Sequence, residues 1–137
     1  MRLYNVYGKL QSRSVAKYII DWNKKSRSKI QFKVKQFLKK YWENHIVYEE
    51  FPVYGTRLSV DIVNATRKIA VEVNGPQHSA FNPFFHKTRQ AYLASIKRDV
   101  QKSKWLEKNN FTLIEIESYE VDKLNKAFVR KKFKINL

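Results

Sequence analysis

The chain has 137 residues, no cysteine and a formal net charge of +16, from 28 Lys and Arg against 12 Asp and Glu. The length suits one domain with its own core, and the missing cysteine excludes disulfides, thiolate zinc sites and a cysteine nucleophile. No apolar run approaches the roughly 18 residues of a membrane span, and the first residues lack the apolar segment of a signal peptide. We therefore expect a cytoplasmic or nucleic-acid-associated protein that is neither secreted nor inserted in a membrane.

The positive charge predicts a polyanionic partner. The hydrophobic content of 43% is high enough for a globular fold. The basic residues are interleaved with Tyr, Phe and Trp and are not concentrated on one amphipathic helix, which favours nucleic acid over a membrane surface. A ribosomal or chromatin-type binder would share this composition, so the charge indicates a class of partner and no activity.

The charge is unevenly distributed along the chain. Residues 1–44 carry a net charge of +10, residues 45–86 a net charge of −1, and residues 87–137 a net charge of +7. A protein that only binds phosphates has no need to collect its carboxylates in the middle of the chain. A metal-dependent nuclease needs basic walls for the backbone and an acidic centre for cations, and this arrangement fits that requirement.

The N-terminal third is expected to be partly helical. Residues 4–10 suit a short strand or an arm, and residues 14–22 suit a short helix. Residues 28–42 predict a longer helix capped by Ser26 or Ser28, with a Lys-rich outer face. Its apolar stripe has helical spacing: Ile30, Val34, Phe37, Leu38 and Tyr41.

The middle of the chain changes to the period of two that is typical of strands. Three strands are predicted at 46–53, 57–63 and 68–73, separated by turns, which indicates an antiparallel meander. Residues 74–88 contain two prolines and are predicted to form a long loop that includes His78 and His86. A loop of this length beside candidate catalytic groups suggests a functional role.

The C-terminal third predicts a helix at 89–108, a strand at 111–116 and a last helix from Ser118 to about Lys132. The apolar stripe expected for the first of these helices consists of Leu93, Ile96, Val100, Ser103 and Leu106. The order of elements predicts an α/β fold with a mixed central β-sheet flanked by helices. We expect a single domain overall, with a basic extension at 1–25, a core at 26–117 and a basic C-terminal helix at 118–137 packed on that core.

Two acidic residues interrupt otherwise apolar strands. The alternating apolar positions are Leu58, Val60 and Ile62 in one strand and Ile69, Val71 and Val73 in the next. Asp61 is therefore expected on the face opposite the first set, and Glu72 and Asn74 opposite the second. If these strands pair, Asp61 and Glu72 converge, and burying two carboxylates is costly unless a cation or hydrogen-bond donors compensate. A divalent metal, most simply Mg²⁺, is the expected compensation.

These residues resemble the signature of PD-(D/E)XK nucleases, in which an Asp on one strand and an acid-x-Lys on the next bind the metal. The matching segments are Val60-Asp61 and, after ten intervening residues, Glu72-Val73-Asn74. Two positions depart from the pattern, because Val60 replaces a frequent Pro and Asn74 replaces a frequent Lys. The string from Ile69 to His78 is similar to the very-short-patch-repair-like branch of this superfamily, and also to the RAP domain of organellar RNA-associated proteins.

The resemblance covers about residues 26–117. Residues 28–38 resemble the first helix of such nucleases, with Gln31 where many of them carry a helical Glu. Residues 98–106 and 111–116 are similar to the later helix and strand of the branch.

The resemblance implies a restriction-endonuclease-like core that hydrolyses phosphodiesters with Mg²⁺, for which Mn²⁺ substitutes. The implied metal ligands are Asp61, Glu72 and the carbonyl of Val73. Asn74, His78 and Gln31 complete the implied catalytic set. Asn74 supplies no cation, His78 has a pKa range suited to proton transfer, and Gln31 can orient water or phosphate without adding charge.

Each candidate also has a structural interpretation. Asp61 could pair with Arg57 at a strand edge, and His78 could bind only backbone. Asn74 and Gly75 could simply form a turn. Asp99 could pair with Lys102 or Arg98 on a helix surface, and His45 and His86 are expected to be non-catalytic.

The expected activity is that of a DNA endonuclease of the homing or repair type. Six cations are predicted to contact nucleic acid: Lys24, Lys25, Arg27, Lys35, Arg57 and Lys102. The expected substrate is duplex or branched DNA, with RNA in second place. One active site would nick one strand, whereas a homodimer would cut both strands or resolve a junction. The alternative is a catalytically inactive RAP-like module that binds RNA.

Overall fold

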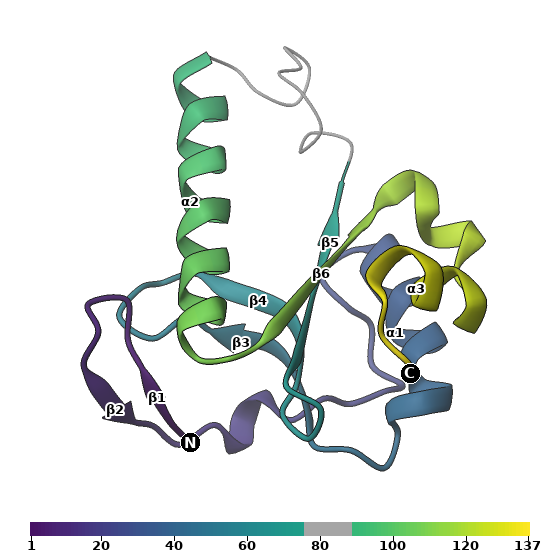
Figure 1. The fold of residues 1–137 in the computed structure, drawn as a ribbon, viewed down its shortest axis with the longest axis horizontal. Coiled ribbons are helices and arrows are strands. Elements are labelled where there is room, and N and C mark those ends of the chain that lie inside the picture. Colours follow the sequence, from purple (N-terminus) through teal and green to yellow (C-terminus); the bar gives the residue numbers. More distant parts are fainter. Residues whose placement is uncertain (76–88) are drawn as a thin grey trace.

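The computed structural model describes residues 1–75 and 89–137 (Figure 1). Its elements, in chain order, are β1 (Arg2–Tyr4), β2 (Leu10–Ser12), η1 (Ala16–Tyr18), α1 (Lys29–Trp42), β3 (Val47–Pro52), β4 (Ser59–Asn64), β5 (Ile69–Asn74), α2 (Arg89–Lys108), β6 (Thr112–Glu117), η3 (Ser118–Lys123) and α3 (Lys126–Phe133). His78 and His86 lie outside the described residues, so their predicted roles have no structural counterpart here. None of the described helices has the length and apolar content needed to cross a membrane.

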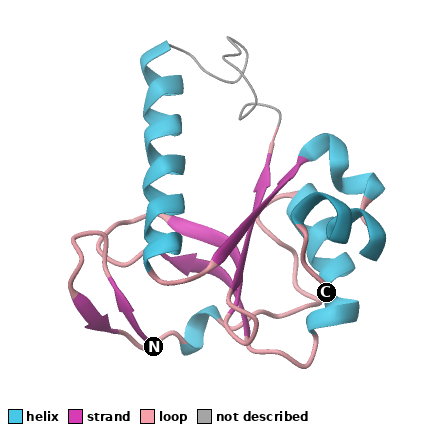
Figure 2. Ribbon diagram, in the orientation of Figure 1, coloured by secondary structure: helices cyan, strands magenta, loops and turns pink. Residues whose placement is uncertain are grey.

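A four-stranded mixed sheet forms the centre of the fold, in the order β3-β4-β5-β6. The strands β3, β4 and β5 pair antiparallel, as the predicted meander requires. After the chain passes through α2, β6 pairs parallel to β5. The prediction of an α/β fold with a mixed central sheet and flanking helices is therefore confirmed (Figure 2).

Each face of the sheet is covered by different elements (Figure 1). On one face, β1 and the C-terminal part of α2 pack against a cluster that includes Leu3, Phe51, Tyr54, Val63, Trp105 and Leu106. On the other face, α1 and η3 pack against a cluster that includes Val34, Leu38, Trp42, Ile62, Val71 and Ile116. The two clusters together give the chain a core on both sides of the sheet, which is typical of α/β folds.

Helix α1 forms where the apolar spacing predicts it. The hydroxyl of Ser28 caps the helix by accepting a hydrogen bond from the backbone N–H of Gln31 at 3.2 Å. Val34, Leu38 and Trp42 recur every four residues and are buried against the sheet. Lys29, Lys33 and Lys40 are exposed on the outer face, so the amphipathic pattern accounts for the position of this helix.

Helix α2 also has the predicted bounds, but only its C-terminal end joins the core. Trp105 and Leu106 are buried, whereas Leu93, Ile96 and Val100 are 55%, 41% and 44% exposed. The predicted apolar stripe therefore joins the core only at the C-terminal end of the helix. The physical reason is the position of the N-terminal part of α2, which extends beyond β3 and β4 (Figure 1).

Two further predictions need correction. The helix expected at 14–22 is reduced to the three residues of η1. The helix expected from Ser118 to Lys132 is divided into η3 and α3, because the backbone at Leu124 is extended and Asn125 caps a new helix. Lys132 nevertheless returns to the first piece, where its ammonium pairs with the buried carboxylate of Glu120.

The N-terminal hairpin of β1 and β2 is tied to the end of α2 through Tyr4. The backbone carbonyl of Tyr4 accepts hydrogen bonds from the indole N–H of Trp105 at 2.7 Å and from the amide of Asn109 at 3.1 Å. The backbone N–H of Tyr4 donates to Asn109 Oδ1 at 2.8 Å. The basic extension at 1–25 therefore packs on the core, and its Leu3 is buried in it.

The substitution Asn109→Ala tests this attachment. It removes both contacts between the Asn109 amide and Tyr4, and it leaves a part-buried backbone N–H without its acceptor. We expect the free energy of unfolding to fall by about 2 kcal/mol, measured as a lower urea midpoint with an unchanged slope. The exposed Glu107→Ala serves as the control, and an equal loss in both variants would contradict this role of Asn109.

Candidate functional site

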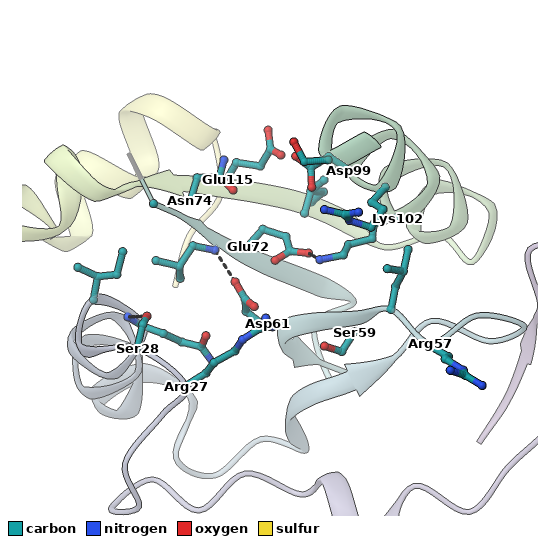
Figure 3. A pocket seen from close by; sticks show the side chains of 18 residues that line it. Arg27, Ser28, Arg57, Ser59, Asp61, Glu72, Asn74, Asp99, Lys102 and Glu115 are labelled. Atoms are coloured by element: carbon teal, nitrogen blue, oxygen red, sulfur yellow. Dashed lines mark hydrogen bonds and ion pairs between the residues drawn. The ribbon is translucent and has the colours of Figure 1, made fainter. Parts of the chain in front are cut away.

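A polar pocket of about 570 Å³ opens between α1, α2 and the middle of the sheet (Figure 3). Four carboxylates and four cations take part in its lining. The polar and charged lining residues are Arg27, Ser28, Gln31, Arg57, Ser59, Asp61, Glu72, Asn74, Ser95, Arg98, Asp99, Lys102 and Glu115. The pocket thus brings together Asp61, Glu72, Val73, Asn74, Gln31 and three of the predicted nucleic-acid contacts, Arg27, Arg57 and Lys102.

The pocket lies where β4 and β5 separate. Their pairing ends at Ile62 and Val71, and the same register places Asp61 opposite Glu72 at the next position. Here a side chain replaces the backbone partner, because Asp61 Oδ2 accepts a hydrogen bond from the N–H of Val73 at 2.8 Å. The N–H and C=O of one strand residue point to the same side, so the carbonyl of Val73 faces this gap as well.

The strands are irregular at this point. Val60 packs with Leu58 on the α2 side of the sheet, whereas Ile62 packs on the α1 side. The prediction that all three share one face is therefore wrong. In the neighbouring strand Glu50 falls opposite Asp61 in the register and has a positive φ of 52°. This conformation is strained for a residue with a side chain, and such strain is concentrated at functional sites.

Asp61 and Glu72 are both buried, with 8% and 9% of their surfaces exposed. Burial, followed by the negative charge of Asp61 and a hydrogen bond to it, raises the pKa of Glu72 to about 9. Lys102 acts against this increase, because its Nζ lies 3.0 Å from Glu72 Oε1. At neutral pH and without a bound metal ion, Glu72 therefore favours its protonated form.

This donor set fits a hard divalent cation. Besides the ammonium of Lys102, a bound cation can replace the proton on Glu72. Mg²⁺ is usually held by one or two carboxylates together with substrate phosphate. Within residues 1–75 and 89–137, no group of three His, Cys, Asp or Glu side chains could hold a metal ion. Asp61, Glu72 and Val73, the ligands that the resemblance implies, all line the pocket.

Gln31 and Lys35 belong to a network beside the pocket. The amide nitrogen of Gln31 donates to Glu49 Oε2 and to Glu50 Oε1, each at 3.0 Å. Lys35 Nζ donates to Glu49 Oε1 and to the carbonyl of Lys24, each at 2.8 Å. Lys35 has no exposed surface, so the prediction that it contacts nucleic acid is wrong. The amphipathic pattern could not show this, because a buried Lys at this position requires an acidic partner on another element.

Asn74 and the other predicted residues take defined positions. The Asn74 side chain lines the pocket and donates to Glu117 Oε1 on β6 at 3.2 Å. Lys24 and Lys25 are exposed on the segment that leads to α1 and do not line the pocket. His45 interacts with the amide of Asn64 at 3.0 Å, outside the pocket lining.

The sequence reasoning missed two contributors to the pocket, Arg98 and Glu115. Arg98 lies four residues before Lys102 on α2, so helical spacing places both on one face and could have identified it. Glu115 is the parallel neighbour of Glu72 in β6, and only the pairing of the strands reveals it. Asp99, which was expected on a helix surface, also lines the pocket.

Comparisons with known proteins give relatives without a stated activity. The chain is 40% identical over 65 residues to "Uncharacterized protein 033L" of Invertebrate iridescent virus 3, a match that covers 47% of this chain and 34% of the relative. It is 41% identical over 59 residues to "Uncharacterized protein 307L" of Invertebrate iridescent virus 6, covering 43% of this chain and 30% of the relative. The chain thus spans about a third of the length of these relatives. No family model matches the chain, and no solved structure matches it.

The raised pKa of Glu72 predicts how stability depends on pH without metal. The folded protein holds a proton that the unfolded chain releases above the ordinary value of 4.5, so this contribution is complete below that pH and is lost as the pH rises toward about 9. The melting temperature in EDTA should therefore fall over this range. Glu72→Gln should flatten that part of the profile, whereas the exposed Glu107→Gln should leave it unchanged. Parallel profiles for Glu72→Gln and the unmodified chain would contradict the assignment.

Proposed function

We propose that the chain is a metal-dependent endonuclease that hydrolyses phosphodiester bonds in DNA. One observation carries this proposal: Asp61 and Glu72 are buried opposite each other in a pocket whose walls supply Arg27, Arg57 and Arg98. Two carboxylates in such a place lack a full compensating charge, and a divalent cation bound with a phosphate would supply it. A pocket with this combination of charges fits a phosphodiester better than a neutral ligand.

The topology supports the finer proposal of a restriction-endonuclease-like core. The order α1, three antiparallel strands, α2 and a parallel β6 is the arrangement that the resemblance to PD-(D/E)XK nucleases implies. Asp61 is on the second of these strands and Glu72 on the third. The two acids of the resembling motif thus lie on successive strands of the sheet, which supports this proposal.

Lys102 is proposed to supply the positive charge that Asn74 lacks. Its ammonium reaches Glu72 from α2, so it can stabilise the negative charge that develops on the phosphate during the reaction. Asp61, Glu72 and the Val73 carbonyl would hold Mg²⁺. When bound, the ion polarises a phosphoryl oxygen and activates the attacking water. Asn74 lines the pocket as an uncharged hydrogen-bonding residue.

The pocket arginines and the N-terminus of α1 are suited to bind the phosphate backbone of the substrate. Ser28 and Arg27 line the pocket at the N-terminus of α1, whose first turn contains no acidic residue. Helix N-termini attract phosphate through free N–H groups and the helix dipole. Arg57 and Arg98 would extend this contact along the strand. A single pocket would nick duplex or branched DNA, and cutting of both strands would require a homodimer.

A catalytically inactive nucleic-acid-binding module is the second candidate. The uncharged Asn74 and the bonded amide of Gln31 favour it, since neither adds charge to a metal site. The ion pair between Lys102 and Glu72 favours the enzyme, because it supplies a cation at Glu72, two residues before the position where the motif lacks one.

Cleavage of supercoiled plasmid and branched DNA, with Mg²⁺, Mn²⁺ or EDTA, tests the proposal. We expect nicking that requires the metal and falls by a factor of about 100 or more in Asp61→Asn and in Glu72→Gln, since both would ligate the ion. The melting temperatures of the variants show whether they are folded. Tight DNA binding by the unmodified chain without cutting under any metal would instead support the inactive module.

Lys102→Ala tests the cation on α2 separately. We expect its cleavage rate to fall by a factor of about 100, with Lys102→Arg recovering part of the loss. Lys104→Ala is the matched control, because Lys104 is exposed on the same helix and does not line the pocket. Equal cleavage rates in Lys102→Ala and Lys104→Ala would contradict a role of Lys102 in the mechanism.

A further inference from the structure

The outer face of α3 carries a compact group of exposed cations. Lys126, Arg130 and Lys131 are all exposed and surround Ala127, whose short side chain leaves a shallow hollow between them. We call these three cations and Ala127 the α3 surface. Three positive charges within two helical turns repel one another, so this arrangement lowers the stability of an isolated helix.

The α3 surface has no structural role within the described part of the chain. Lys132, the neighbour of these cations, is the residue that fixes α3 by pairing with Glu120. Among the described residues, Lys126, Arg130 and Lys131 have no ion pair or side-chain hydrogen bond. The helix dipole favours Arg130 and Lys131 in the last turn, but it disfavours Lys126 in the first. The helix dipole therefore leaves the charge of Lys126 uncompensated, and a bound anion would compensate it.

A membrane surface does not fit this helix. Membrane-binding helices expose an apolar face beside their basic face. In α3 the apolar side is used internally, because Val129 is buried and Phe133 packs against the core cluster under α1. The exposed part offers only charge, which suits a phosphate backbone.

The α3 surface is separate from the pocket. No residue of α3 lines the pocket, and α3 lies beside α1, whereas α2 covers the other side of the sheet (Figure 1). We propose that the α3 surface is a second binding site for the phosphate backbone of duplex DNA, so that the chain holds its substrate at two separated places. This inference rests on the proposed function for its choice of DNA. It implies that only a duplex long enough to reach both sites gains the contacts of the α3 surface while it occupies the pocket.

The test compares salt dependence of binding for two labelled duplexes, of roughly one and three helical turns. The α3 variant is Lys126→Ala/Arg130→Ala/Lys131→Ala, in which alanine favours the helix. Each phosphate contact contributes about 0.9 to the slope of log K against log salt. We therefore expect the magnitude of this slope to be smaller by about 2.7 in the α3 variant than in the unmodified chain on the long duplex. On the short duplex the slope should change little.

The matched control is Arg2→Ala/Lys9→Ala/Lys108→Ala, which removes the same charge from exposed residues around the N-terminal hairpin. Equal slopes for the two triple variants would reduce the effect to net charge and overturn the proposal. An equal decrease on both duplexes would overturn the separation from the pocket. Vesicles of phosphatidylserine and phosphatidylcholine are a further arm, and loss of vesicle binding with an unchanged DNA slope would assign the surface to lipid.

Parallel cleavage assays distinguish this inference from the proposed function. A decreased slope in the α3 variant, with no cleavage by the unmodified chain, would support the second binding site and contradict the proposed nuclease activity. Metal-dependent cleavage with an unchanged slope would support the nuclease activity and contradict the second binding site. The α3 variant should also cut the short duplex at the unmodified rate, because no residue of the pocket is changed.

Discussion

The burial of two carboxylates at one point of the sheet is the constraint on which the site depends. Asp61 and Glu72 occupy neighbouring positions in the register, where regular pairing of β4 and β5 has ended. Because Asp61 accepts the hydrogen bond from Val73, this backbone N–H of β5 remains satisfied although the strand has left β4. The separated strands open a pocket that α1 and α2 reach from opposite sides, so the feature that is costly for the sheet also makes the site accessible.

The network around Gln31 fixes the wall of this pocket without adding to its metal ligands. The positive φ of Glu50 interrupts the alternation of β3, and the amide of Gln31 then reaches Glu49 and Glu50 together. The buried ammonium of Lys35 compensates this acidic pair and holds the carbonyl of Lys24. The segment that leads to α1 is thereby attached to β3 opposite Asp61. A strained residue persists only when its surroundings determine its conformation, and these hydrogen bonds provide that support.

The elements and the two acids could be predicted from sequence because both depend on short-range patterns. Periods of 3.6 and 2 indicated α1, the three strands, α2 and β6 within about two residues, and two acids in apolar strands indicated the pocket. The errors at the site and in α2 concern long-range contacts. The faces of Val60 and Ile62 depend on a distortion in the neighbouring strand, and the burial of Lys35 depends on Glu49. The exposed apolar residues of α2 depend on where the sheet ends.

The contact between Lys102 and Glu72 shows why the motif alone could not decide between an enzyme and an inactive module. In the sequence, Asn74 stands where the motif often has Lys, so the motif lacks its cation. In three dimensions the cation of Lys102, thirty residues farther along the chain on α2, contacts Glu72. Its position is set by the buried Trp105 and Leu106, which fix the C-terminal end of α2 against the sheet. The charge at the pocket is therefore a property of the packing of α2, and changes in that packing should alter the site even where every pocket residue is retained.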